Sequence, residues 1–132
     1  MKHLFFSLFL MATMVGHAQY YRSYQAKINY GESFSHGDIR IEFLKIISDS
    51  RCPKSVNCVW AGEAKVQVAI YKGRKKLGKK TLIFDASGVI TDKKNLLFSD
   101  EEARIIGMAL FPYPQSPDNI PAEAYCLEVK IN

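Results

Sequence analysis

The segment Ala-Lys-Val-Gln-Val-Ala-Ile-Tyr, residues 64–71, alternates apolar with polar side chains over most of its length. Successive side chains of an extended chain point to opposite faces, so the branched apolar side chains share one face and the polar ones share the other. This pattern predicts a strand with one face in a hydrophobic core. Residues 125–131 repeat it, with Cys126, Glu128 and Lys130 between the apolar positions. Strands of this kind are typical of an all-β sandwich or barrel.

Four further strands are predicted where short apolar runs lie between turn residues. They cover residues 25–30, 38–47, 81–84 and 104–111. Within residues 38–47 the alternation changes phase at Leu44, which indicates a β-bulge or burial on both faces. About seven strands in a chain of this length predict a small antiparallel β-sandwich, immunoglobulin-like or similar.

Two segments in the C-terminal half of the chain carry signals for a helical turn and for a loop. Residues 99–102, Ser-Asp-Glu-Glu, have the spacing of a capping box, so a short helical turn is expected there. Prolines follow the strand expected at 104–111, at positions 112, 114, 117 and 121. Because proline cannot donate a hydrogen bond to a sheet, these positions predict a loop.

The N-terminus has the organisation of a secretory signal peptide. Lys2 precedes an apolar run over residues 4–15, and Gly16-His17-Ala18 places small residues at the two positions that signal peptidase recognises. We expect cleavage between Ala18 and Gln19, which leaves residues 19–132 as one domain in the periplasm or outside the cell. The run is shorter than the roughly 20 apolar residues that cross a bilayer, so no membrane span is expected. The alternative is a buried N-terminal helix of a cytosolic protein.

Composition indicates one ordinary globular domain with a mild positive charge. The net charge is +5, and no repeat, low-complexity tract or Pro/Gly-rich linker divides the chain. A charge this mild predicts solubility and is not by itself a sign of a nucleic-acid partner. A domain this small has an unfavourable ratio of surface to volume, so a covalent cross-link would help to stabilise it.

The cysteines provide such a cross-link. Cys52 and Cys58 lie six positions apart in a turn-rich segment between the strands expected at 38–47 and 64–71. In an oxidising compartment we expect them to pair with each other. Closing a loop of this length should stabilise the fold by roughly 2 kcal/mol.

The residues around the two cysteines are expected to have structural roles. We expect Trp60 to pack over the sulfur atoms or into the core. We also expect Arg51 to form an ion pair with Asp49 or with Glu63. Together with the disulfide, these contacts would hold the crossover between the two strands.

Redox and metal chemistry are the alternatives for the cysteines. Catalytic dithiols usually have Cys-x-x-Cys spacing, which Cys52 and Cys58 lack. A zinc site would need both of them with Cys126 and His36, and no pair among the four has the spacing of a zinc finger. We therefore expect neither a metal nor a cofactor. Cys126 is expected to be a half-buried free thiol, with an intermolecular disulfide as the alternative.

The cysteine segment also carries a family resemblance. Asp49-Ser50-Arg51-Cys52-Pro53, followed by Cys58-x-Trp60-Ala61-Gly62-Glu63, resembles the signature of a group of uncharacterised small bacterial proteins that are secreted or lipid-anchored. The Pro-rich segment 111–114 and Tyr125 are similar to the way such chains end. The resemblance implies no activity, and this chain lacks the cysteine that follows the signal peptide of lipid-anchored members. It marks as motif residues Asp49, Ser50, Arg51, Pro53, Trp60, Gly62 and Glu63.

A second candidate site is a cluster of cationic side chains within residues 72–80. The cluster consists of Lys72, Arg74, Lys75, Lys76, Lys79 and Lys80. Gly73 and Gly78 favour a hairpin loop that displays the charges at a tip, where they would contact an anionic envelope component or an acidic protein surface. Nucleic acid is not an expected partner, since the segment has no aromatic residue for base stacking. A solvated loop without a partner is the alternative.

These features support two hypotheses about function. The favoured one is a non-catalytic binding or structural module of the cell envelope, which presents the cysteine loop and the basic hairpin to a partner. The alternative is a small secreted hydrolase, whose site would combine dispersed carboxylates with His36 and a serine. The residues available for it are Asp49, Glu63, Asp85, Asp92, Asp118, Ser50 and Ser87. The sequence has no nucleophile-elbow motif that would favour the enzyme.

Overall fold

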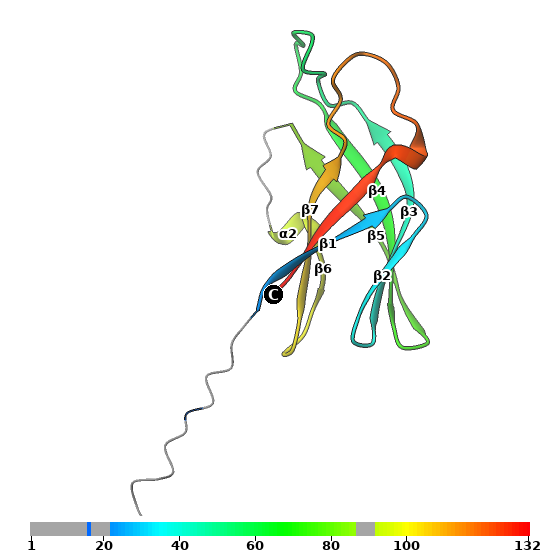
Figure 1. Cartoon of the computed structure of the whole chain (residues 1–132), viewed down its shortest axis with the longest axis vertical. Coiled ribbons are helices and arrows are strands. Elements are labelled where there is room, and N and C mark those ends of the chain that lie inside the picture. Colours follow the sequence, from blue (N-terminus) through cyan, green and yellow to red (C-terminus); the bar gives the residue numbers. More distant parts are fainter. Residues whose placement is uncertain (1–15, 17–21, 87–91) are drawn as a thin grey trace, which may run out of the picture.

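The computed structural model describes residues 16, 22–86 and 92–132, and this part of the chain is an all-β domain (Figure 1). Eight strands form two four-stranded antiparallel sheets around one core. The first sheet has the order β1-β8-β7-β6, with bounds Tyr24–Asn29, Cys126–Ile131, Arg104–Phe111 and Leu96–Ser99. The second has the order β2-β3-β4-β5, with bounds Ser33–His36, Ile39–Asp49, Glu63–Lys72 and Lys75–Asp85. The helix α2 covers Asp92–Asn95, and the 3-10 turn η1 covers Ala122–Ala124.

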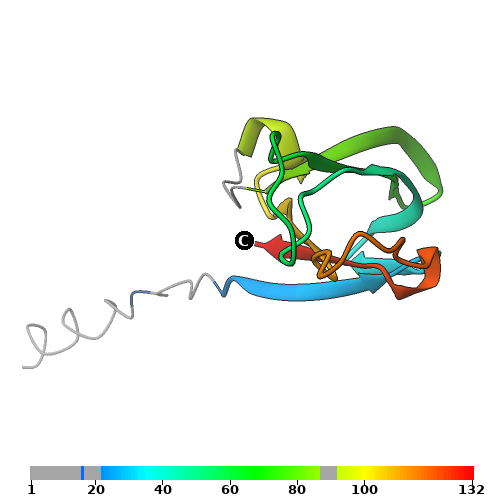
Figure 2. The same ribbon diagram turned by 90° about the horizontal axis from the view of Figure 1, so that it is seen from above.

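The predicted antiparallel β-sandwich is confirmed, and Figure 2 shows its two layers end-on. The predicted signal peptide falls outside the described residues, apart from Gly16. Among the described helices, none is long and apolar enough to cross a membrane.

The core lies between the inner faces of the two sheets. In β4 the side chains of Ala64, Val66 and Val68 are fully buried, as the alternation predicts. β8 contributes Leu127 and Val129 from the opposite sheet in the same way. These buried branched side chains supply most of the driving force for folding, because each removes apolar surface from water.

Close approach of the sheets depends on Gly107 in β7. A Cβ atom at this position would lie 2.8 Å from Cδ1 of Leu82 in β5, which is closer than carbon atoms normally approach. The absence of a side chain therefore lets β5 pack directly on the backbone of β7.

Along one side of the sandwich, the turn between β1 and β2 connects the two sheets. The backbone N–H of Gly31 donates to the carbonyl of Phe43, and the N–H of Phe43 donates to the carbonyl of Glu32. Gly31 has a φ of 76°, a conformation that glycine adopts without steric cost. The second sheet is a meander of consecutive strands, so its order differs from the immunoglobulin arrangement, in which each sheet combines strands distant in sequence.

The six strands expected from the sequence are all present. The phase change in β3 corresponds to register shifts between Phe43 and Lys45 and between Ile46 and Ser48. The four-residue strands β2 and β6 were not anticipated, because they are too short for a periodic signal. The helical turn expected at residues 99–102 is wrong: Oδ1 of Asp100 accepts hydrogen bonds from the N–H groups of Glu102 and Ala103, which makes a turn into β7.

The expectation of a nine-residue basic loop is also wrong. Only Gly73 and Arg74 form the turn, and β5 already begins at Lys75, opposite Lys72 of β4. Gly73 has a φ of 58°, which suits a two-residue hairpin. The strand is favoured because each further pair of residues adds backbone hydrogen bonds to β4. β5 is an edge strand, and lysines on an edge discourage pairing with another chain.

The edge of β5 beyond the lysines is covered by α2. Asn95 is 2% exposed, and its side-chain amide accepts from the N–H of Ile83 at 3.1 Å and donates to the carbonyl of Ile83 at 2.9 Å. The amide thus satisfies the backbone N–H and carbonyl of Ile83, as a neighbouring strand would. Nζ of Lys80 donates to the carbonyl of Leu96 in β6, which joins the two sheets on their second side.

Candidate functional site

The predicted pairing of Cys52 with Cys58 is confirmed, with their Cα atoms 5.9 Å apart. The bridge closes a loop between β3 and β4, and we call residues 52–61 the apex loop because they project from one end of the sandwich (Figure 1). Cys126 takes no part in the bridge and is half-buried. Burial raises the pKa of the Cys126 thiol, so the thiol is not activated for attack.

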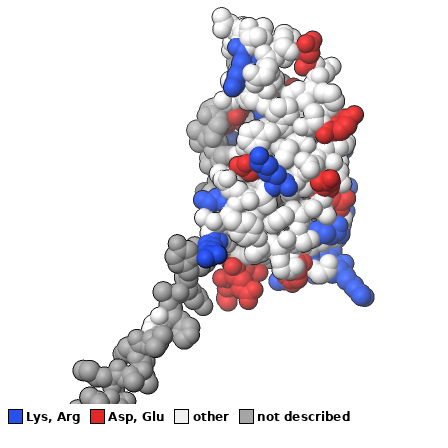
Figure 3. Space-filling model, viewed as in Figure 1, with Lys and Arg blue, Asp and Glu red and all other residues white. Residues whose placement is uncertain are grey.

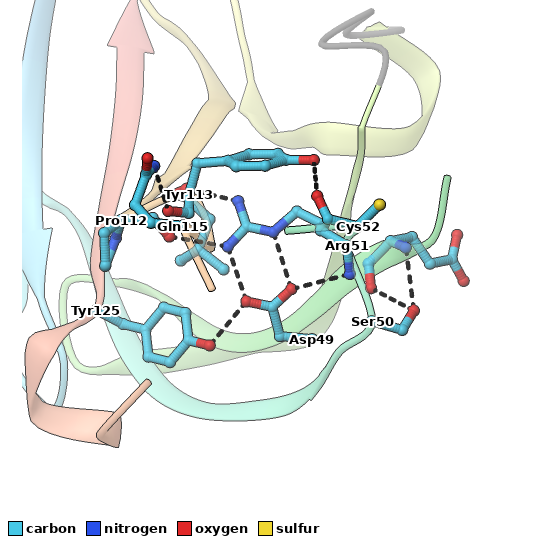
Figure 4. Close-up of polar contacts among 10 residues, drawn as sticks. Asp49, Ser50, Arg51, Cys52, Pro112, Tyr113, Gln115 and Tyr125 are labelled. Carbon is cyan, nitrogen blue, oxygen red and sulfur yellow. Dashed lines mark hydrogen bonds and ion pairs between the residues drawn. The ribbon is translucent and has the colours of Figure 1, made fainter. Parts of the chain in front are cut away.

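The base of the apex loop is held by the guanidinium of Arg51, which is 5% exposed (Figure 4). Nε donates to Oδ1 of Asp49 at 2.9 Å and Nη2 donates to Oδ2 at 2.8 Å, so the ion pair is bidentate. Nη1 donates to the carbonyl of Leu110 at 2.9 Å, and Nη2 donates to the carbonyl of Pro112 at 3.0 Å. Arg51 thereby connects the end of β3 with the end of β7. Of the two expected partners, Asp49 is the correct one.

Two tyrosines complete this network. The hydroxyl of Tyr125 donates to Oδ2 of Asp49 at 2.7 Å, and the hydroxyl of Tyr113 donates to the carbonyl of Cys52 at 2.7 Å. The Arg51 guanidinium lies 5.1 Å from the centre of the Tyr113 ring. The sequence marked this part of the chain only through the family resemblance, since the tyrosines lie about 60 to 75 residues after the motif and no local pattern connects them.

The protonation states of the network suit a structural role. Burial acts to raise the pKa of the Asp49 carboxyl, but hydrogen bonds from Arg51 and Tyr125 outweigh it and lower that pKa overall. Burial and the hydrogen bond to Asp49 raise the pKa of Tyr125 to about 12. Asp49 is therefore an anion and Tyr125 a neutral donor at physiological pH. Both oxygens of Asp49 already accept two hydrogen bonds each, which leaves no free base for catalysis.

The other motif residues close the stem of the apex loop. Oγ of Ser50 donates to the carbonyl of Glu63 at 3.0 Å and accepts from its N–H at 3.1 Å. The N–H of Cys52 donates to the carbonyl of Ala61 at 2.9 Å. Gly62 has a φ of 72°, and a Cβ atom there would lie only 1.7 Å from the carbonyl oxygen of Ser50. Glycine is thus required at this position.

A second loop supports the first. The N–H of Lys54 donates to the carbonyl of Pro114 at 3.1 Å, and the N–H of Ser55 donates to the carbonyl of Gln115 at 3.2 Å. These bonds resemble a short strand pairing between the apex loop and the Pro-rich loop. The Glu63 side chain faces away from this network and pairs with Lys65 at 3.0 Å.

A cleft of about 330 Å³ lies between the base of the apex loop and the Pro-rich loop. Its ionisable lining residues include Asp49, Arg51, Tyr125 and Asp118. The first three are bonded to one another, and Oδ2 of Asp118 accepts from the hydroxyl of Ser116 at 3.1 Å. Pro53 also lines the cleft, but the apolar residues at the tip of the apex loop do not. The cleft and the tip are separate features.

The apex loop carries exposed apolar side chains, which corrects the expectation for Trp60. The side chain of Trp60 is 81% exposed, so it neither covers the disulfide nor enters the core. Val59 is 92% exposed and Val56 is 40% exposed. Val59 and Trp60 lie between the disulfide at Cys58 and the stem hydrogen bond from Cys52 to Ala61, so the chain holds them on the apex loop and outside the core.

The cationic residues 72–80 lie at the opposite end of the sandwich, and the pairing of β4 with β5 distributes them over both faces of the sheet. Lys80 reaches the first sheet, and Nζ of Lys72 lies 5.7 Å from the centre of the Phe98 ring in β6. On the outer face, Lys79 lies opposite Ala69, and Nζ of Lys76 lies 5.9 Å from the centre of the Tyr71 ring. Figure 3 shows cationic and anionic side chains interspersed over the visible face, including its upper end. Lys72, Arg74, Lys75 and Lys76 therefore stay beside the turn, whereas Lys79 and Lys80 lie further along β5.

Of the residues of the hydrolase alternative, Asp49, Ser50 and Asp118 line the cleft together, but His36 does not. His36 in β2 contacts the hydroxyl of Tyr24, whereas Asp49 lies at the far end of β3, about 30 Å away at the usual rise per residue of a strand. Ser87 lies outside the described residues, as does the side chain of Asp92. Among the residues that the structure describes, no group of three or more His, Cys, Asp or Glu side chains is arranged to hold a metal ion.

In comparisons with known proteins, no family model, curated protein or solved structure matches the chain.

Proposed function

We propose that this protein is an exported, non-catalytic binding module of the cell envelope that engages its partner through the apex loop. One observation carries the proposal: Trp60 and Val59 are almost fully exposed on a loop that a disulfide and a buried ion pair hold in place. Large apolar side chains in the open carry a cost in solubility, so a contiguous exposed set indicates an interaction site.

Rigidity of the loop supports this role. A binding loop that is ordered before contact loses less conformational entropy on binding. The contacts of Arg51, Ser50 and Gly62 all act on the base of the loop, while no motif residue other than Trp60 presents an apolar side chain at the tip. The motif would then serve to position a tryptophan. Tryptophan is also the residue type most enriched among side chains that dominate binding energy.

Export and membership of the motif-bearing bacterial group remain part of the proposal. The signal-peptide pattern of residues 1–18 supports delivery to the periplasm or the exterior. The apex loop and the cationic residues lie at opposite ends of β4, about 30 Å apart, so a small partner would contact one of them and not both.

The test measures association with the envelope and not activity. The purified exported protein is mixed with envelope fragments of the source cell and sedimented, and the bound fraction is compared among wild type, Trp60→Ala and Leu77→Ala. Leu77 is also an exposed apolar residue, but it lies in β5 at the other end. We expect Trp60→Ala to lose most of the binding and Leu77→Ala to keep it. Equal binding by all three proteins would contradict the proposal.

A further inference from the structure

The shape of the apex loop limits the kinds of partner that it suits. Its large exposed apolar side chains are one indole and two valines, Trp60, Val59 and Val56. The loop that carries them projects from the end of the sandwich (Figure 1). An indole offers about 200 Å² of contact surface. A stable protein interface buries about 800 Å² on each partner, so a protein would need a deep pocket around this loop. A bilayer surface deforms around a small projecting loop and needs no such pocket.

The charges around the tip are compatible with a lipid surface. From residue 51 to residue 60 the chain contains no acidic side chain, and its two cations are Arg51, which is buried and paired, and Lys54. Nζ of Lys54 lies 5.8 Å from the centre of the Tyr113 ring. The nearest stem acid, Glu63, is paired with Lys65. A lipid headgroup layer would therefore meet no unpaired carboxylate on this loop.

The side chain of tryptophan suits the headgroup region of a bilayer. Its ring is largely apolar while its N–H remains a hydrogen-bond donor, and tryptophan is accordingly enriched at the boundary between lipid tails and water. On these grounds we propose that the apex loop docks on the surface of a lipid bilayer, with Trp60 and Val59 entering the boundary between headgroups and acyl chains. This inference rests on the proposed function and names its partner.

Docking of this kind is reversible and depends little on salt. Three side chains bury less apolar surface than a myristoyl chain, which by itself gives an association constant of only about 10⁴ M⁻¹. One exposed cation at the tip adds little electrostatic attraction. The sandwich would stand on the bilayer with the turn between β4 and β5 directed away from it, so the lysines of β5 would not contribute.

The experiment uses the fact that Trp60 is the only tryptophan of the chain. Its fluorescence is recorded while the exported protein, with its N-terminal mass verified, is titrated with phosphatidylcholine vesicles, with and without phosphatidylglycerol. We expect a blue shift and protection from an aqueous quencher with both kinds of vesicle, and little change on adding salt. Val59→Ser keeps the reporter and should weaken partitioning about tenfold, as expected for the loss of one buried valine. Leu77→Ser should partition like wild type.

The outcomes separate this inference from the proposed function. Absence of a spectral shift at the highest lipid concentration, or an equal shift in the Val59→Ser protein, would overturn lipid docking. If envelope fragments still bind in a Trp60-dependent manner and lose this binding after protease treatment, the partner is a protein and only the lipid inference falls. If they bind the Trp60→Ala protein equally well, the proposed function falls too.

Discussion

Arg51 and Asp49 form a bidentate ion pair, with side-chain exposures of 4% and 9%, between the end of β3 and the start of the apex loop. The same guanidinium bonds to two carbonyl groups at the end of β7. The pair therefore joins the two sheets at the end from which Trp60 projects.

Replacing Arg51 by methionine should destabilise the fold by about 3–5 kcal/mol, because it leaves Asp49 as a buried anion without its partner. The free energy of unfolding from urea denaturation measures this loss. Arg40→Met is the matched control, since the pair of Arg40 with Glu42 is 3.8 Å long and partly exposed and should contribute less than about 1 kcal/mol. Similar losses in both variants would contradict a special role for Arg51.

Asp49 should make stability depend on acid pH. Its pKa is lower in the folded protein than the ordinary value of 3.8, so its contribution is fully present above pH 3.8 and is lost as the pH falls through the folded-state pKa. Urea unfolding at a series of acid pH values should show this loss. Backbone N–H donors also lower the pKa of Asp100, so Asp49→Asn should make the acid dependence shallower without abolishing it. Identical pH dependence in wild type and Asp49→Asn would refute the assignment.

Removing the disulfide through the double change Cys52→Ala and Cys58→Ala should lower stability by about 2 kcal/mol and reduce the melting temperature. Reduction of the wild type should have the same effect, while Cys126→Ser should have none. Peptide mapping without reduction should recover one linked pair. A peptide in which Cys126 is joined to either partner would disprove this connectivity.

Replacing Lys80 should lower the stability of the fold more than replacing Lys75, although both are surface lysines of β5. Lys80→Met removes the hydrogen bond to the carbonyl of Leu96 and should cost about 1–2 kcal/mol. Lys75 is exposed beside the turn, so Lys75→Met should stay within about 0.5 kcal/mol of wild type. Thermal melting of the two variants provides the comparison. Equal melting temperatures would mean that Lys80 does not connect the sheets.

Export should remove residues 1–18 and yield a chain that begins at Gln19. The small residues Gly16 and Ala18 after the apolar run motivate this site. Intact-mass spectrometry of the protein recovered from outside the cytoplasm measures the N-terminus directly. Recovery of a chain that retains Met1 to Ala18 would exclude cleavage.

The local features of this protein follow from its sequence alone. Period-two alternation over residues 64–71 and 125–131 determined two core strands and their buried faces, because side-chain direction in a strand is a local property. Short spacing in a turn-rich segment predicted the pairing of Cys52 with Cys58, since cysteines close in sequence are expected to pair in an oxidising compartment. The same reasoning suggested two partners for Arg51 and had no local basis for choosing between them.

Tertiary structure decided everything that depends on which surfaces meet. Packing of the sheets brought Leu110, Pro112 and Tyr125 onto the Asp49–Arg51 pair, and these residues are 59 to 76 positions away along the chain. The lysine-rich segment was expected to be a loop, but most of it belongs to β5 because it pairs with β4. Trp60 was expected to pack over the disulfide or into the core, but it is 81% exposed because the apex loop projects from the end of the sandwich. Burial is a property of the whole packed chain, whereas the alternation of side chains belongs to each strand by itself.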